Sequence, residues 1–125
     1  MDGTSAHVHE QGSYETAEYA DELDAAPSNL AVGSSLLYEN DQVKVWEIRL
    51  APGERGPFHA HTHNYFWTVV EAGVGKQRLA DGSYMVRDYE VGQTQFSAHS
   101  ADAPLIHDLE NAGDTELRFI TVELL

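Results

Sequence analysis

Short strand-like runs separated by turn residues fill the chain from Ser35 to its end, and they constrain the fold more than any other feature. Eight such runs follow one another: SLLYEN, QVKVWEIRLA, YFWTVVEA, GKQRLA, SYMVRDYEV, TQFSA, LIHDLEN and ELRFITVELL. Glycine-rich and other turn-forming segments such as APGERGP, EAGVG, ADGS and NAGDT separate them and supply the residues that hairpins need. Eight strands in this length leave no room for crossover helices, so the spacing excludes a parallel α/β fold and predicts an all-β antiparallel sandwich or barrel.

The first 29 residues differ from the rest, because they hold seven acids and no Lys or Arg. Ala, Glu and Leu favour a short helix over residues 15–25, although its acids have no basic residue four positions on. We therefore expect residues 1–29 to form an acidic, mobile N-terminal extension. Residues 30–125 are long enough to form one domain around a single core.

The chain is strongly acidic, with 21 Asp and Glu against 7 Lys and Arg and a net charge of −14. Such a surface repels the phosphates of nucleic acids and anionic membranes. No run approaches the roughly 20 apolar residues that cross a bilayer, and the polar start lacks the apolar core of a signal peptide. We therefore expect a cytoplasmic protein whose partner is a small molecule, and not nucleic acid or a membrane.

Three histidines alternate in the segment GPFHAHTHNYFW, at His59, His61 and His63. Alternate side chains of an extended chain point the same way, so these imidazoles share one face if the strand is unbroken. Burying several imidazoles without partners is costly, whereas a divalent cation satisfies their lone pairs. A solvated loop that carries histidines is the simpler interpretation of an isolated HxH motif.

His107 is the third informative histidine and lies 46 residues after His61, in the alternating run LIHDLEN. In an antiparallel barrel this separation can return the chain beside its starting strand. We therefore expect His59, His61 and His107 to face one metal ion and to leave its other positions open. Because the chain has no cysteine, the ligands must be nitrogen or oxygen atoms.

These residues resemble the two motifs of a single-domain cupin of the RmlC-like superfamily. The first cupin motif is a glycine, five residues, HxH, a glutamate and a second glycine, and the second motif ends in a histidine and an asparagine. The matching residues here are Gly53, His59, His61 and Gly73 in the first motif, and His107 and Asn111 in the second. The resemblance covers roughly residues 36–125 and implies a jelly-roll β-barrel with a metal ion inside.

Two departures from the cupin pattern affect the site. The position of the motif glutamate falls on Phe66, or on Tyr65 with the shorter spacing, and neither replaces a carboxylate ligand. The proline and glycine of the second motif are replaced by Ala98-His99-Ser100, which implies a longer loop before His107. His63 and His99 are the two candidates for the vacant ligand position.

The ligand set resembles that of cupin dioxygenases, which implies a metal-dependent enzyme, an oxygenase that acts on a small oxygen-bearing molecule. Three neutral imidazoles bind Fe, Mn, Ni, Cu or Zn, and the missing carboxylate leaves the complex more positive, which favours an anionic ligand. With zinc, the same site would carry isomerase, lyase or hydrolase chemistry. The remaining alternative is a cupin that binds a small ligand without converting it.

The residues after the histidines are candidates for the substrate pocket. Tyr65 is the candidate catalytic residue, because a phenol can supply a proton or a hydrogen bond, although an interface or core tyrosine is the simpler interpretation. Alternation predicts that Phe66, Thr68 and Val70 face inward and that Tyr65, Trp67 and Val69 face outward. We expect Phe66, Thr68 and Arg49 to line the pocket, although a strand arginine can also pair with surface acids. Outward aromatic residues predict a homodimer.

Overall fold

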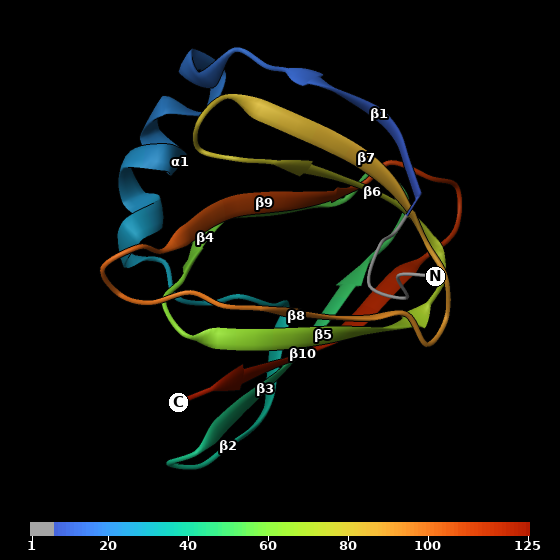
Figure 1. Ribbon diagram of the computed structural model, residues 1–125. Helices are drawn as coiled ribbons and strands as arrows, with labels where there is room; N and C mark the ends of the chain where they lie inside the picture. The colour runs from blue at the N-terminus through green and yellow to red at the C-terminus, as the bar shows by residue number, and fades with distance from the viewer. Residues whose placement is uncertain (1–6) are drawn as a thin grey trace.

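The computed structural model describes residues 7–125 and folds them into two antiparallel sheets that enclose the interior of a β-barrel (Figure 1). One sheet has the strand order β1-β7-β6-β9-β4 and the other β2-β3-β10-β5-β8. This confirms the predicted all-β antiparallel barrel. The strands are β1 (His7–Ser13), β2 (Ser35–Glu39), β3 (Val43–Leu50), β4 (Arg55–His61), β5 (Asn64–Glu71), β6 (Gly73–Arg78), β7 (Ser83–Tyr89), β8 (Thr94–Ser97), β9 (Leu105–Asn111) and β10 (Leu117–Leu124).

All eight predicted runs contain a strand, and two further strands lie outside them. The first is β4, whose beginning falls in the glycine- and proline-containing segment that resembled a turn. The second is β1, which pairs antiparallel with β7. Among the described residues, no helix has the length and apolar character needed to cross a membrane.

Residues 7–29 of the N-terminal segment pack on the barrel. The mobility that we expected for residues 1–29 stays a prediction, and residues 1–6 lie outside the described part of the chain. After β1 come η1 (Thr16–Tyr19), α1 (Ala20–Ala25) and η2 (Ala26–Ser28), close to where the sequence favoured a helix. The acids of this segment find partners far along the chain, such as the Tyr84 hydroxyl that donates to Glu10 at 2.7 Å. Such contacts cannot be recognised from the sequence when only basic residues four positions along the helix are considered.

Aromatic side chains join the N-terminal segment to the outer face of the first sheet. The ring of Phe58, which is buried, stacks with Tyr14 at 6.3 Å and meets Tyr19 edge-on at 5.6 Å. The guanidinium of Arg55 lies 4.5 Å from the centre of the Tyr19 ring, within the range of a cation–π contact. In Figure 1 the helical turns accordingly cover one end of this sheet.

A buried ionic network lies below this aromatic cover. Asp108 of β9 is fully buried and accepts hydrogen bonds from Arg55 Nε at 2.7 Å and Arg78 Nη1 at 3.0 Å. Arg55 also donates to Glu22 of α1, with Nη2 2.6 Å from Oε1. The network thus ties α1, β4, β6 and β9 together, directly outside the strands that carry the histidines.

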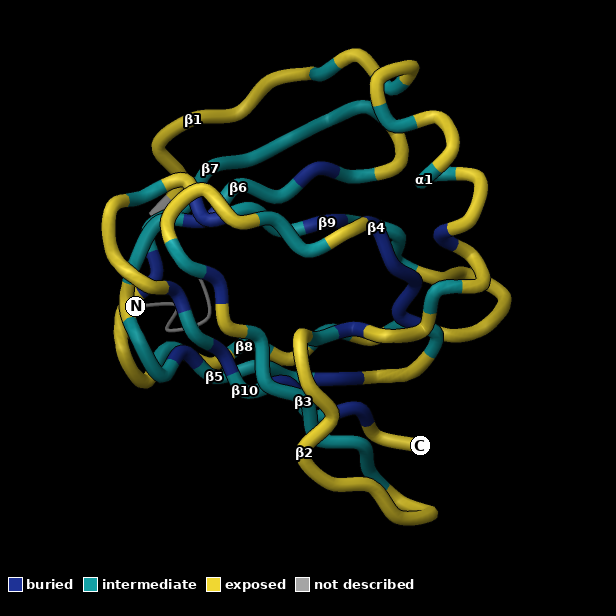
Figure 2. The backbone as a smooth tube through the Cα atoms, turned by 180° about the vertical axis from the view of Figure 1, so that it is seen from behind, coloured by how far each residue is buried: buried dark blue, intermediate teal, exposed yellow. Residues whose placement is uncertain are grey.

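The core lies between the two sheets, around Val69, Tyr89, Leu117 and Phe119. Figure 2 shows buried segments on strands of both sheets. Gly75 is needed here, because a Cβ at this position would lie 2.9 Å from the Tyr89 ring. The aromatic ring of Tyr89 therefore packs directly over the backbone of β6.

The predicted orientation of β5 is wrong. Tyr65 and Val69 are buried, and Trp67 packs against the core, so these residues face inward. The alternate residues face outward, as the exposed contact between the Thr68 and Thr94 hydroxyls shows. Alternation defines two faces of a strand but does not say which one is inside. The break between β4 and β5 at residues 62–63 also means that the inward positions of β5 do not continue the alternation of the histidines on β4.

Candidate metal centre

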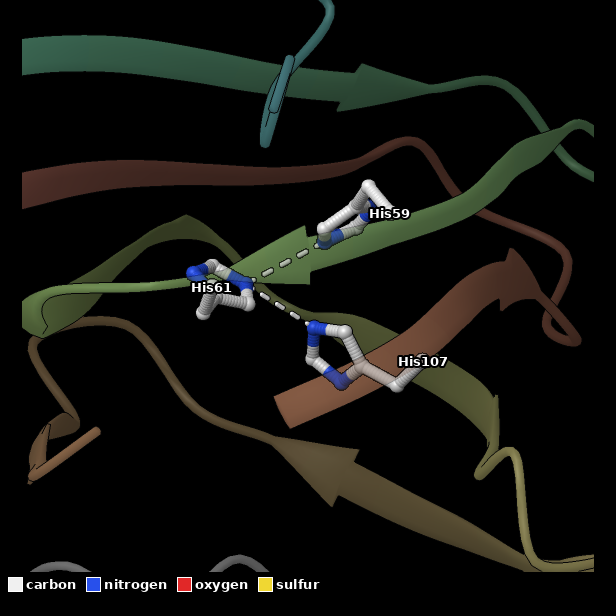
Figure 3. A group of neighbouring side chains, drawn as sticks. All are labelled: His59, His61 and His107. Atoms are coloured by element: carbon white, nitrogen blue, oxygen red, sulfur yellow. Dashed lines mark hydrogen bonds between the residues drawn. The ribbon is translucent and has the colours of Figure 1, made fainter. Parts of the chain in front are cut away.

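Two adjacent strands carry the three predicted histidines. Strands β4 and β9 pair antiparallel, with His59 directly opposite His107, and His61 lies two residues further along β4 on the same face. The three imidazoles meet inside the barrel (Figure 3), with His61 Nε2 3.1 Å from His59 Nε2 and 3.0 Å from His107 Nε2. The ligand atoms of all three lie within 4.8 Å of one another. The structure thus brings together the three histidines that the sequence singled out.

Two hydrogen bonds fix the proton positions on the outer histidines. His59 Nδ1 donates to the carbonyl oxygen of Pro57 at 3.0 Å, and His107 Nδ1 donates to Gln77 Oε1 at 2.5 Å. Both imidazoles then carry their proton on Nδ1 and present a bare Nε2 lone pair to His61. His61 Nδ1 is buried and has no hydrogen-bond partner. The cluster therefore holds more lone pairs than its own protons can satisfy.

Burial keeps these imidazoles neutral. It lowers the pKa of His59, and it lowers the pKa of His61 to about 2, with a further contribution from the neighbouring His59. Burial also lowers the pKa of His107 well below its ordinary value, again reinforced by the other histidines. Neutral imidazole is the form that binds a metal ion.

The spacing of the nitrogens fits a divalent ion. Two nitrogens that each lie about 2.1 Å from one ion, at about a right angle, stand roughly 3.0 Å apart. The observed separations of 3.0 and 3.1 Å agree with this value. Together with the neutral rings and the inward lone pairs, the spacing means that these three residues could hold a divalent metal ion.

Neither candidate for the vacant fourth position belongs to the convergent group. His63 is exposed in the bend between β4 and β5. His99 lies in the segment after β8, where its Nε2 is 2.8 Å from the Ser97 hydroxyl. Within the described residues, the group that can hold an ion consists of three histidines and no carboxylate.

A cavity of about 50 Å³ adjoins the three histidines. Its walls are mainly apolar and aromatic, and the residues around it, apart from the histidines, are Ile48, Tyr65, Trp67, Gln77, Tyr89, Leu109, Phe119 and Thr121. The predicted pocket residues Phe66, Thr68 and Arg49 do not line it, which corrects that prediction. The first two lie on the outer face of β5, and Arg49 is half-exposed and pairs with Glu116 at 3.4 Å.

Tyr65 lies in the cavity wall, as the candidate catalytic role requires. Its ring stacks on His61 with 3.9 Å between centres and an angle of 11° between planes. Burial raises the pKa of the phenol to about 12, so Tyr65 is protonated at neutral pH. A protonated phenol can donate a hydrogen bond to a molecule in the cavity.

Sequence reasoning missed Gln77 and Trp67. Gln77 lies on β6 and reaches His107 from the neighbouring strand, so only the strand pairing reveals its role. Its alternation with the inward Gly75 was the available indication. Trp67 was missed because alternation predicted that it faces outward, together with Tyr65 and Val69.

A jelly-roll barrel with HxH on one strand and a third histidine on its neighbour defines the cupin class, and the chain is a single-domain cupin. It is similar to a cupin domain from Bordetella pertussis, with 24% identity, a TM-score of 0.64, and coverage of 73% of this chain and 90% of that one. An RmlC-like cupin family protein from Methanocaldococcus jannaschii has 19% identity, a TM-score of 0.58 and coverage of 72% and 76%. A cupin 2 conserved barrel domain protein from Salinispora arenicola has 15% identity, a TM-score of 0.54 and coverage of 78% and 82%.

These structural similarities concern the fold alone, because the identities are low. The family model described as "Auxin binding protein" matches residues 15–123, and the chain belongs to this family. No curated protein matches the sequence.

Proposed function

We propose that the protein holds a divalent metal ion with His59, His61 and His107 and uses it in oxygen-dependent chemistry on a small molecule. The observation that supports this proposal is the convergence of three neutral imidazoles. The Nε2 atom of His61 lies 3.1 and 3.0 Å from the Nε2 atoms of the other two, a separation that suits nitrogens bound to one ion. A bound Fe, Mn or Cu ion would supply redox chemistry with oxygen, and a Ni or Zn ion would act as a Lewis acid.

The chain's own residues would bind and orient the substrate. Apolar and aromatic walls restrict water in the cavity, which strengthens every polar contact inside it. The cavity of about 50 Å³ has space for more than one water molecule, and we expect the part of the substrate that reacts there to be small. The Tyr65 phenol would donate a hydrogen bond to an oxygen of that molecule.

A protein that binds a small ligand without converting it is the alternative. Two observations favour it: the convergent group has no carboxylate, and the family is described as a binding protein. A zinc-dependent isomerase, lyase or hydrolase would use the same ligands. The identity of the bound metal and the consumption of oxygen distinguish the oxygenase from the binding protein and from the zinc-dependent enzyme.

The test is elemental analysis of protein purified without a histidine tag, followed by oxygen-electrode measurements with small diketones and thiols. The proposal predicts a redox-active metal in a fixed ratio to the chain, and oxygen uptake that disappears in His59→Ala but persists in His63→Ala. Stoichiometric zinc without oxygen uptake would contradict the oxygenase proposal and favour the alternatives.

We also propose that the protein is a cytoplasmic homodimer. The sequence has no cysteine, so the fold needs no oxidising compartment to form disulfides. The edge strand β2 is exposed along its whole length and carries Leu36, Leu37 and Tyr38, which are 42%, 52% and 58% exposed. Such an edge is suited to a second copy of the chain.

A further inference from the structure

A second cavity, of about 40 Å³, shares part of its wall with the cavity at the histidines. The residues common to both cavities are Ile48, His59 and Leu109. The other residues around the second cavity, which we call the seam cavity, are Ala31, Val32, Gly33, Leu50, Gly56 and Pro57. The seam cavity thus adjoins the proposed metal centre through the ring of a proposed ligand, and the proposed function gives it no role.

The segment between η2 and β2 closes this side of the barrel by crossing from one sheet to the other. At one end the carbonyl oxygen of Asn29 accepts a hydrogen bond from the Ala60 amide of β4 at 2.9 Å. At the other end the Ser34 amide donates to the carbonyl oxygen of Glu47 on β3, in the second sheet, at 2.8 Å. Between these anchors Val32 is 1% exposed and forms part of the cavity wall. The seam cavity therefore lies between the two sheets, under a segment that is fixed at both ends.

The side chains around the seam cavity offer water no hydrogen bond. His59 is the one polar side chain among them. Its Nδ1 donates to the Pro57 carbonyl oxygen at 3.0 Å, and its Nε2 lies 3.1 Å from His61 Nε2. A buried water needs roughly two to four polar partners, whereas an apolar cavity stays dry and takes up apolar gases such as xenon. Because Ala31 and Pro57 are exposed, the cavity also lies close to the surface. It therefore favours a small apolar molecule over water.

We propose that the seam cavity binds dioxygen beside the histidine group. Dioxygen carries no charge and forms only weak hydrogen bonds, so it prefers apolar surroundings to water. A diatomic molecule is little larger than water, and about 40 Å³ exceeds the roughly 10–15 Å³ that one water needs. The walls that separate this molecule from the histidine cavity are the shared side chains of Ile48 and Leu109. The use of the bound oxygen rests on the proposed function, whereas its binding rests on the seam cavity alone.

The test is methyl NMR of the full chain, zinc-loaded and metal-free, under oxygen and under nitrogen. Dioxygen is paramagnetic and speeds the relaxation of nearby protons, so the difference between the two gases locates it. We expect an enhancement at Val32 and Leu50 at least about twofold larger than at close-packed core residues, which leave no space for a gas molecule. The reference residues are Val69 and Leu117, which are 1% and 0% exposed and line neither cavity.

Val32→Ile should reduce the enhancement at Leu50 by at least about half, because the added methyl group occupies part of the space. Val122→Ile is the matched control, because Val122 alternates with the buried residues of β10 and adds the same methyl group outside the cavity. It should leave the enhancement unchanged. If Val32→Ile fails to fold, Val32→Thr replaces it, since Thr is also β-branched and adds a hydroxyl that favours water over oxygen.

Equal enhancement at the seam-cavity residues and at the reference residues would overturn the proposal. An enhancement at Leu50 that the Val32 variant leaves unchanged would overturn it too, because the oxygen would then lie elsewhere. Zinc content, measured in every sample, separates the two proposals. A chain that binds no zinc contradicts the metal site, whereas the metal-free spectra still decide where oxygen binds.

Discussion

At the level of single residues, the site depends on which ring nitrogen of each histidine carries a proton. The Pro57 carbonyl and the Gln77 amide oxygen each accept a hydrogen bond from Nδ1, so Nε2 is left free toward the centre. The Gln77 partner was not predictable from the sequence, because Gln77 belongs to a strand 30 residues from His107. The histidines themselves were predictable, because an HxH motif and a distant third histidine can be recognised without knowing which strands pair.

Replacing Gln77 by Met should weaken metal binding by roughly 10–100-fold, because outer partners orient a ligating histidine and raise its basicity. The dissociation constant can be measured by competition with a chelator. Gln42→Met is the matched control, because Gln42 is exposed in the bend between β2 and β3 and is not part of the histidine group. Equal affinities of the two variants would show that the Gln77 contact has no role.

The neutral histidines predict a pH dependence of stability in the metal-free protein. Burial lowers the pKa of His61 to about 2, whereas an unfolded histidine has a pKa of about 6.5. Between these values the unfolded chain binds more protons, so the free energy of unfolding is highest above about pH 6.5 and decreases as the pH falls. Each such histidine contributes up to about 1.4 kcal/mol per pH unit.

Urea unfolding at pH 7, 6 and 5 measures this dependence. Wild type should lose stability steadily across the series, and His61→Gln should have a smaller slope because one of the buried imidazoles is gone. A free energy of unfolding that is constant from pH 7 to pH 5 would mean that the histidines are not held neutral by burial.

At the level of elements, the strands were predictable because short apolar runs between turn residues seldom form any other secondary structure. Strand β1 was not, because its sequence is polar and its stability comes from pairing with β7. The inner face of β5 was assigned wrongly, since Tyr65 follows a bend that resets the alternation. The first failure depends on a contact between segments far apart in the chain, whereas the second depends on a local bend.

The contact between α1 and β4 predicts that Glu22→Gln destabilises the protein. Hydrogen bonds from Arg55 and from the Phe58 amide hold the Glu22 carboxylate, and they keep its pKa low although burial alone would raise it. Losing the charge should cost about 1–3 kcal/mol of the free energy of unfolding.

Thermal or urea unfolding measures this cost, with Asp24→Asn as the matched control. Asp24 lies on the same helix but is exposed. If the two variants lose the same stability, the ion pair with Arg55 does not anchor the N-terminal segment to the barrel.

At the level of the whole molecule, a net charge of −14 and an exposed apolar edge act in opposite directions. The charge repels a second copy of the chain, and the edge strand β2 favours one. Salt screens repulsion between exposed charges, with a Debye length of about 8 Å at physiological ionic strength.

We therefore predict a homodimer whose dissociation constant decreases as salt is added. Leu37→Asp on β2 should shift the equilibrium to the monomer, because it places a charge on the proposed interface. Val91→Asp is the control, since Val91 is 68% exposed in the turn before β8. Sedimentation equilibrium checks both variants, and a wild type that is monomeric at all salt concentrations would contradict the prediction.

The metal content of single histidine variants tests the central claim most directly. Untagged wild type, His59→Ala, His61→Ala, His107→Ala and His63→Ala are purified in parallel and analysed for metals, with circular dichroism as the check of folding. The site predicts that wild type and His63→Ala hold the same amount of metal, because His63 is exposed and lies outside the convergent group. The other three should lose it. Retention of metal by folded His107→Ala, together with its loss in His63→Ala, would contradict the account.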